Sequence, residues 1–123
     1  MRPEEVVAAY VSAWAEPDEV RRLATLATCW TLEGTYVDPS GRADGRAALC
    51  EHIGEFQRSF VGHRLELASG VDEHDGYLRF AWTMFGPDGG EVMEGVDFGQ
   101  LDGEGRLRMI CGFFGPFPQS PGS

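Results

Sequence analysis

The chain has 123 residues, 42% of them hydrophobic and 24% charged, which is typical of one folded domain and too apolar for a disordered segment. Acidic residues outnumber basic ones by 20 to 10, and the resulting negative field repels phosphate backbones and anionic membranes. We therefore expect neither nucleic acid nor a membrane surface as a partner.

The N-terminus and the cysteines indicate the compartment. Acids stand directly ahead of the first apolar residues, unlike in a signal peptide, and no apolar stretch approaches the roughly 20 residues that cross a bilayer. Cys29, Cys50 and Cys111 are an odd number, widely spaced and flanked by apolar residues, as buried reduced thiols would be. We predict a cytoplasmic protein without a disulfide framework. A nucleophilic cysteine with a distant histidine stays open as a lesser alternative.

Two helices are predicted at the start of the chain. Residues 3–15 carry apolar side chains at steps of three and four, after Pro3 in the first turn. The inward face of this helix is predicted to hold Val6, Val7, Tyr10, Val11 and Trp14. A second helix, capped by Asp18, runs to about residue 30. Its predicted inward residues are Val20, Leu23, Ala24, Ala27 and Trp30.

A turn and a third helix follow. Residues 34–37 read as a short extended piece, and the run from Asp38 to Gly41 forces a turn because a residue before proline is pushed out of the helical region. A third helix is expected over 45–60, since apolar residues fall at steps of four, three and four. These residues are Leu49, Ile53, Phe56 and Phe60.

The second half of the chain changes to β periodicity. The runs 64–70, 77–85, 92–101 and 106–114 are rich in strand formers and are separated by Asp/Gly clusters that are typical of hairpin loops. Four strands in succession predict an antiparallel meander. Residues 115–123 are predicted to be a flexible tail.

Both faces of the predicted sheet carry bulky side chains. Leu78, Phe80, Trp82 and Met84 share one face of the run 77–85. In the last run, one face is predicted to hold Leu107, Met109, Cys111 and Phe113, opposite Ile110 and Phe114. One helical layer covers only one face, so we expect the outer face to meet a second copy in a homodimer.

The order of elements resembles one superfamily. Three helices, a short strand ending in Asp38-Pro39 and a meander ending in Gly112-Phe113-Phe114-Gly115 resemble the nuclear transport factor 2-like (NTF2-like) superfamily, which includes ketosteroid isomerases, SnoaL-type polyketide cyclases and limonene epoxide hydrolase. The resemblance covers residues 3–115. It implies an α+β fold, a cone-shaped α+β barrel with three N-terminal helices on a curved, mainly antiparallel sheet. Residues 1–123 would then be one SnoaL-like or ketosteroid isomerase-like domain that binds a small apolar organic ligand.

Three residues carry a closer likeness to ketosteroid isomerase. That enzyme has a Tyr in its first helix, Asp-Pro at a helix-strand corner and a second Asp in its third long strand, and Tyr10, Asp38 and Asp97 match these places. The resemblance implies that Asp38 is the base that moves a proton between carbons. Tyr10 and a protonated Asp97 would then donate hydrogen bonds to the enolate oxygen.

Physical chemistry supports the same residues. Proline after Asp38 holds that carboxylate in a fixed direction, as a general base requires. Asp97 lies mid-strand on an apolar face, so burial should raise its pKa. The glycines at 95 and 99 leave room beside it for a ligand or a large side chain. The predicted ligand-binding residues are Trp14, Phe56, Phe60, Trp82, Met93 and Phe113.

Other interpretations stay open for each of these residues. Asp38 could be a turn residue only, Tyr10 could be core, and Asp97 could pair with Arg79 or Arg108 across strands. The protein could then be a non-catalytic ligand-binding or dimerisation module of the same fold. An epoxide-hydrolase-like site would instead place Arg79 between the two carboxylates.

The histidines and glycines predict neither metal nor cofactor. His52 is expected to be solvated or half-buried, His63 and Arg64 to lie at the surface or at a pocket rim, and His74 to be exposed. They lack ligand spacing within one element, and the glycines form no phosphate-binding loop.

Overall fold

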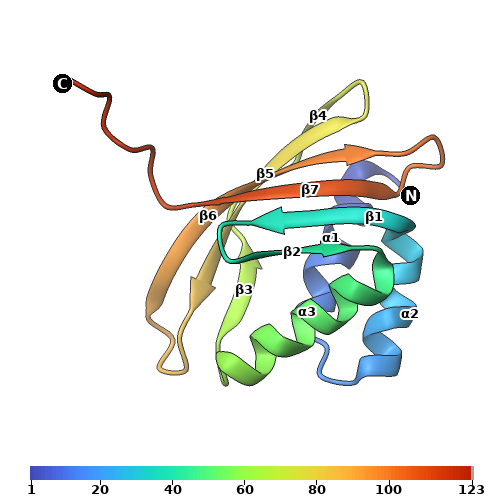
Figure 1. Ribbon diagram of the computed structural model, residues 1–123, viewed down its shortest axis with the longest axis horizontal. Coiled ribbons are helices and arrows are strands. Elements are labelled where there is room, and N and C mark those ends of the chain that lie inside the picture. The colour runs from blue at the N-terminus through green and yellow to red at the C-terminus, as the bar shows by residue number, and fades with distance from the viewer. Residues whose placement is uncertain (123) are drawn as a thin grey trace.

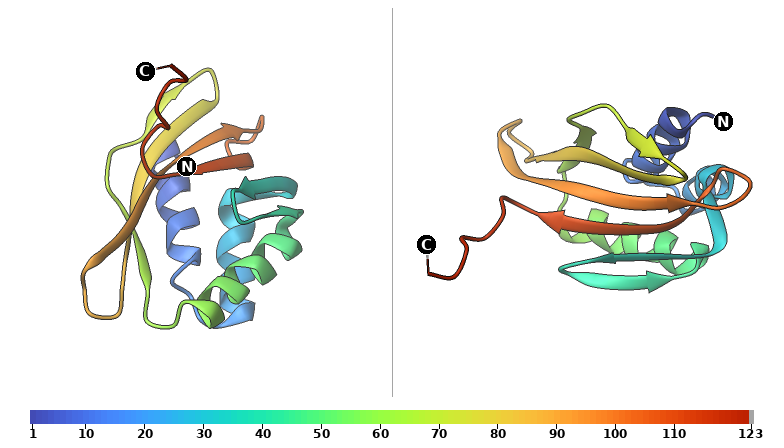
Figure 2. Two further views of the ribbon diagram at one scale, coloured as in Figure 1. Left: turned by 60° about the vertical axis from the view of Figure 1, so that its left-hand side comes forward. Right: turned by 90° about the horizontal axis from the view of Figure 1, so that it is seen from above.

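The computed structural model describes residues 1–122, in which three helices lie on one side of a curved sheet (Figures 1 and 2). The helices are α1 (Pro3–Ala13), α2 (Glu19–Cys29) and α3 (Arg46–Ser59). The strands are β1 (Trp30–Asp38), β2 (Gly41–Asp44), β3 (Arg64–Leu67), β4 (Asp72–His74), β5 (Tyr77–Phe85), β6 (Glu91–Leu101) and β7 (Leu107–Phe114). The predicted α+β class, with three N-terminal helices and a mainly antiparallel sheet, is confirmed.

The strand order is β2-β1-β7-β6-β5-β3. Strand β4 is not part of this order and pairs with β5. Strands β3, β5, β6 and β7 are antiparallel neighbours, as predicted, whereas β1 pairs with β7 in parallel. The end strands β2 and β3 do not pair with each other, so the sheet is an open curved half-cone. Strands β2 and β4 were not predicted, because short polar segments become strands only when a neighbouring edge supplies the hydrogen bonds.

Helix α1 buries the residues that its period predicts. Glu5 accepts a hydrogen bond from the Arg2 amide at 3.0 Å and satisfies one free donor at the start of the helix. Val6, Val7 and Tyr10 are buried, while Trp14, directly after the helix, is half-buried. The apolar face of α1 therefore supplies both core and, at its C-terminal end, a wall for the site described below.

The predicted inward face of α2 is wrong except at Trp30, which is fully buried and begins β1. Asp18 caps the helix as expected, accepting from the Arg21 amide at 2.9 Å. The exposed fractions of Val20 and Leu23 are nevertheless 77% and 40%. The exposed positions also include Ala24 and Ala27, and the buried ones are Arg22, Leu26 and Cys29.

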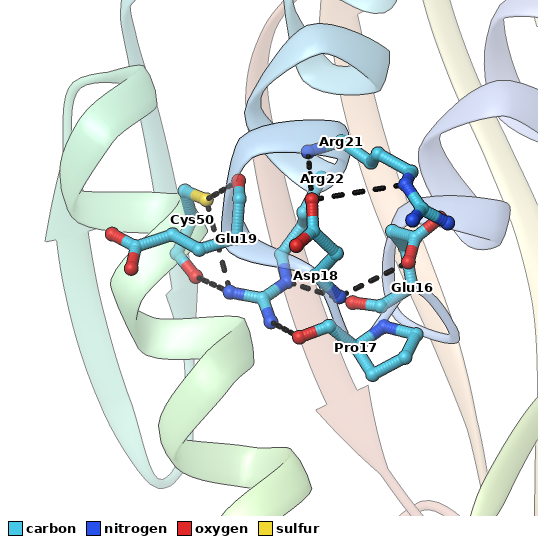
Figure 3. Close-up of polar contacts among 7 residues, drawn as sticks. All are labelled: Glu16, Pro17, Asp18, Glu19, Arg21, Arg22 and Cys50. Carbon is cyan, nitrogen blue, oxygen red and sulfur yellow. Dashed lines mark hydrogen bonds and ion pairs between the residues drawn. The ribbon is translucent and has the colours of Figure 1, made fainter.

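Arg22 explains this rotation of α2. Its guanidinium donates to the carbonyl oxygens of Glu16 (3.0 Å), Pro17 (3.2 Å) and Cys50 (2.9 Å), contacts that Figure 3 shows, and to the side-chain oxygen of Gln57 (3.0 Å). A buried guanidinium is tolerated only when its N–H groups find acceptors. The loop before α2 and the nearby face of α3 supply those acceptors, so this side of α2 faces inward.

The inner face of the sheet follows the predicted alternation in β5, where Leu78, Phe80, Trp82 and Met84 are buried. Leu107 in β7 departs from it, because the register between β6 and β7 shifts at Leu101. Such an irregularity changes the face of the sheet toward which the next side chains point. Leu107 and Ile110, which were predicted on opposite faces of this strand, are therefore both fully buried, which corrects the prediction.

The outer face of the sheet carries exposed apolar side chains. Val92, Phe98 and Phe113 are 54%, 44% and 56% exposed, and the rings of Phe98 and Phe113 contact each other edge to face. The homodimer through this face stays a prediction. Light-scattering measurement of the mass of the wild type and of the Phe98→Asp variant tests it, since a charge on this face would separate the copies.

The remaining sequence predictions concern the tail, the cysteines and membranes. Residues 115–122 form no helix or strand and extend away from the body (Figure 1), and Ser123 of the predicted tail lies outside the described residues. Cys29 and Cys50 are buried and Cys111 is half-buried, all as free thiols. Within residues 1–122, every helix is too short or too polar to cross a bilayer. The cytoplasmic location stays a prediction.

Candidate functional site

A cavity of about 290 Å³ lies between the helices and the inner face of the sheet. Its walls are mostly aromatic and aliphatic side chains: Tyr10, Val11, Trp14, Tyr36, Phe56, Phe60, Leu65, Phe80, Trp82, Met84, Met93 and Phe114. The polar residues of its lining are Asp38, Ser40, His52, Glu55, Ser59 and Asp97. An apolar pocket with a few polar groups is the usual form of a small-molecule site.

Most of the predicted site residues meet at this cavity. Tyr10, Asp38 and Asp97 all line it, and so do five of the six predicted ligand-binding residues, namely Trp14, Phe56, Phe60, Trp82 and Met93. Phe113 does not, because successive strand residues point to opposite faces and Phe113 points outward. Its neighbour Phe114 takes the place that was predicted for it.

The strand register brings the two aspartates together. Asp97 in β6 pairs directly with Gly112 in β7, and the parallel pair of Val37 with Cys111 sets Asp38 beside Gly112 from the other side. The point where a Cβ on Gly112 would stand lies 2.8 Å from Oδ1 of Asp97 and 3.4 Å from Cβ of Asp38. Gly112 therefore leaves the space that the Asp97 carboxyl and the Cβ of Asp38 both approach.

Asp97 lies at the inner wall of the cavity with 6% of its surface exposed. Its Oδ1 accepts a hydrogen bond from the Trp82 indole at 3.0 Å. Burial raises the pKa of Asp97 to about 7, Trp82 lowers it, and the nearby charge of Asp38 raises it further. Near neutral pH a large share of Asp97 is thus protonated and able to donate.

Gly95 makes the contact between Trp82 and Asp97 possible. The Trp82 ring lies across Gly95, with an indole carbon 2.2 Å from the place of an absent Cβ. The expectation that the glycine leaves room for a large side chain beside Asp97 is confirmed. Any other residue at position 95 would push the indole out of this position.

Asp38 is held by four donors. Its Oδ1 accepts from the Ser40 amide (2.7 Å), the Ser40 hydroxyl (2.6 Å) and the Gly41 amide (3.1 Å). The Tyr36 hydroxyl donates to its Oδ2. One oxygen thus fixes the β1–β2 turn, while the other lies with Tyr36 among the cavity residues.

Two tyrosine hydroxyls stay protonated at the same end of the cavity. Burial raises the pKa of Tyr10 well above its usual value, and the charge of Asp97 adds to this, while hydrogen bonding from Trp14 opposes it. Burial likewise raises the pKa of Tyr36, with a smaller contribution from Tyr10. Both groups can therefore donate to an oxygen that gains negative charge.

Sequence reasoning missed five polar residues of the lining: Tyr36, Ser40, His52, Glu55 and Ser59. Tyr36 stands two residues before Asp38 on one strand, so alternation places both on the same face. His52 and Glu55 share the helical stripe of Phe56, at steps of three and four. The half-buried His52 ring lies 5.2 Å from the Tyr36 ring and 6.1 Å from the Trp14 ring.

The arginines lie away from the carboxyl pair. Arg79 is exposed, and its Nε lies 2.8 Å from Asp72 at the outer side of the sheet. The predicted alternatives of an Arg79–Asp97 bridge and of Arg79 between the carboxylates are therefore wrong. Arg108 is exposed and forms no ion pair with Asp97 within residues 1–122.

The other histidines stand outside the cavity. His63 lies against Phe60, with ring centroids 5.5 Å apart, without lining the cavity itself. His74 is exposed beside Asp75, as predicted. In the described part of the chain, no three His, Cys, Asp or Glu side chains gather as a metal site requires.

Known structures share this fold. A crystal structure of a candidate isomerase of the SnoaL-like family from Agrobacterium tumefaciens str. C58 superposes with a TM-score of 0.88, at 32% identity over 94% of this chain and 100% of that one. An NTF2-like protein of unknown function from Exiguobacterium sp. 255-15 gives 0.72, at 15% identity over 91% of this chain and 99% of that one. A candidate polyketide cyclase from Sinorhizobium meliloti gives 0.69, at 13% identity over 88% and 93%.

The last two similarities concern the fold alone. No family model matches the sequence. No curated protein matches it either. The Agrobacterium protein, however, is similar over nearly the whole of both chains at an identity that is characteristic of one family. The predicted resemblance is thereby confirmed, and the chain belongs to the SnoaL-like family of the NTF2-like superfamily.

Proposed function

We propose that the protein is an isomerase or cyclase that binds a small, mainly apolar carbonyl compound and transfers a proton at the carbon next to the carbonyl. One observation carries this proposal: Asp38 and Asp97 approach the same point beside Gly112, at the polar end of an otherwise aromatic cavity. Paired carboxyl groups whose surroundings differ are suited to opposite roles, one as base and one as hydrogen-bond donor.

In this mechanism the Asp38 carboxylate removes a proton from the carbon. The electron pair of the C–H bond forms a carbon–carbon double bond, and the π pair of the carbonyl moves to its oxygen. The resulting enolate accepts hydrogen bonds from Tyr10 and from protonated Asp97. Trp82 occupies Oδ1 of Asp97, which leaves the other oxygen of that carboxyl to carry the proton toward the ligand. In an isomerase, Asp38 then returns its proton to another carbon. In a cyclase, the enolate carbon attacks a second carbonyl, whose π bond breaks, and the resulting alkoxide takes the proton back from Asp38.

Deuterium exchange tests this proposal without knowledge of the natural substrate. Phenylacetone is incubated with the protein in D₂O, and loss of its methylene proton signal is followed by NMR. We expect the wild type to accelerate exchange and Asp38→Asn to reduce the acceleration by about 100-fold or more, because a general base contributes on this order. Asp75→Asn, the same change at an exposed loop position, should keep the full rate.

A binding module without chemistry is the second candidate. The contacts of Asp38 favour it, since three of the four donors belong to the turn itself and would hold this carboxylate whether or not it acts as a base. Saturable binding of phenylacetone with an exchange rate equal to that in buffer would support the binding module and contradict proton transfer.

A further inference from the structure

The cavity lining is acidic. Asp38, Glu55 and Asp97 contribute three carboxyl groups, and no lysine or arginine lines the cavity within residues 1–122. The formal net charge of the chain, −10, adds a negative field around it. A carboxylate or phosphate ligand would meet repulsion here without a cation to bind it, whereas a positively charged ligand would be attracted.

The carboxyl groups reach the cavity from two sides, the sheet and α3. Asp38 and Asp97 lie together at the sheet, beside Gly112. Glu55 comes from α3, on the helical stripe that also presents Phe56 to the cavity, and its side chain is exposed at the cavity wall. A ligand of moderate length can therefore place one end at the aspartate pair and another at Glu55.

Aromatic rings line the cavity from Phe56, the neighbour of Glu55 on α3, to Tyr36, which donates to Asp38. The Trp14 ring lies 5.4 Å from Phe56, inclined at 75°, and 5.7 Å from Tyr36, inclined at 52°. Phe60 stacks on Phe56 at 5.2 Å. Rings at such different inclinations turn both faces and edges into the space, and the face of an aromatic ring attracts a cation through its quadrupole.

We propose that the natural ligand carries a positively charged ammonium group, which binds among Trp14, Phe56 and the Glu55 carboxylate. Rings and a carboxylate together offer both attractions that an alkylammonium group can use, and the cavity of about 290 Å³ has room for a small organic cation. This inference rests on the proposed function only in its premise that the cavity holds a small organic ligand, and it names the chemical class of that ligand.

Two probes of equal shape test whether the cavity prefers a positively charged ligand. Phenyltrimethylammonium and tert-butylbenzene differ only in the exchange of a carbon atom for a positively charged nitrogen. Binding of each is measured by titration of the intrinsic tryptophan fluorescence, since Trp14 and Trp82 line the cavity. We expect the cation to bind about tenfold more tightly than its neutral counterpart. A site that selects only for apolar surface would prefer tert-butylbenzene.

Two variants separate the local effect of Glu55 from the general field. Glu55→Gln should weaken binding of phenyltrimethylammonium about fivefold and leave tert-butylbenzene unchanged. Glu51→Gln removes the same charge from an exposed position one turn earlier on α3, outside the cavity lining, and should change neither affinity by more than about 1.5-fold.

The possible results are distinguishable from failure of the proposed function. If tert-butylbenzene binds as tightly as the cation, the ammonium proposal is overturned, while the cavity remains a ligand site. If equal losses follow from Glu55→Gln and Glu51→Gln, the placement at Glu55 is overturned. If neither probe binds, the premise itself is lost. Deuterium exchange into phenylacetone reports on proton transfer independently of all three.

Discussion

Arg22 and Asp97 are charged residues with exposed fractions of only 4% and 6%, yet their surroundings differ. Arg22 lies between α2, α3 and the loop before α2, where its guanidinium donates to three carbonyl oxygens and one side-chain amide. Asp97 lies on the sheet at the wall of a cavity, and one indole N–H donates to it.

This difference separates a buried charge that only holds the fold together from one that is available to a ligand. The Arg22 contacts are satisfied entirely by the protein, so they stabilise the packing of α2 without leaving a group for a ligand. Asp97 has one oxygen engaged by Trp82, a raised pKa and a cavity beside it. A buried acid with a perturbed pKa beside a cavity is a candidate for binding or chemistry, which supports the proposal that this cavity is the functional site.

The largest expected effect concerns Asp97→Asn and the pH dependence of stability. The folded pKa is about 7 and the model-peptide value is 3.8, so between these pH values the folded state binds a proton that the unfolded state has lost. Stability should therefore fall as pH rises from about 4 to about 7, by up to about 4 kcal/mol from this residue.

Urea denaturation at pH 4.5 and at pH 8 measures this effect. Asp97→Asn should be clearly more stable than the wild type at pH 8 and close to it at pH 4.5. Equal stability of the two proteins at both pH values would show that Asp97 is not a destabilising buried acid, and the contrast with Arg22 would disappear.

Arg22→Met should destabilise the fold by about 3 kcal/mol, because several buried acceptors lose their donors. Binding of phenyltrimethylammonium at the cavity should stay unchanged, since Arg22 does not line it. Urea denaturation and the fluorescence titration measure the two quantities. Arg21→Met, at an exposed neighbouring position, should cost less than about 0.5 kcal/mol. If Arg22→Met instead lost phenyltrimethylammonium binding and kept its stability, Arg22 would serve the cavity and not the packing of α2.

Gly112→Ala adds a single methyl group, yet we expect it to disturb the aspartate end of the cavity. The added methyl group would stand 2.8 Å from Oδ1 of Asp97, so the carboxyl must move, at a cost of about 2 kcal/mol. Any acceleration of deuterium exchange into phenylacetone should also fall, because the Asp97 carboxyl is displaced. Gly103→Ala is the matched control, because nothing lies within 4 Å of the new methyl group there. Equal effects of the two variants would contradict the packing of both aspartates against Gly112.

Trp82→Phe gives the smallest expected effect. It removes the N–H that lowers the pKa of Asp97, so that pKa should rise. The fall in stability still begins near pH 4 and should continue to a higher pH than in the wild type. The additional loss at pH 8 should be about 1 kcal/mol. Denaturation midpoints measured across pH 5 to 9 report this shift, and an unchanged pH profile would mean that the indole does not stabilise the ionised form.

Periodicity predicted the helices and the long strands because those elements are set by local geometry. The stripe of α1 and the alternation of β5 placed Tyr10 and Trp82 correctly at the inner side. The apolar surroundings of Asp97 were also visible in the sequence, and its raised pKa agrees with them. The pairing of β1 with β7 was not visible, since it joins residues far apart in the chain.

The α+β class, the Asp38-Pro39 corner and the glycines that make room beside Asp97 could be read from the chain, because each depends on residues that are neighbours in the sequence. The inward turn of Arg22, the outward turn of Phe113 and the access of Tyr36, His52 and Glu55 to the cavity follow from packing between distant segments. These outcomes depend on which partner each face meets. A helix or strand that could bury either of its faces does not determine which one is buried until the other elements pack against it.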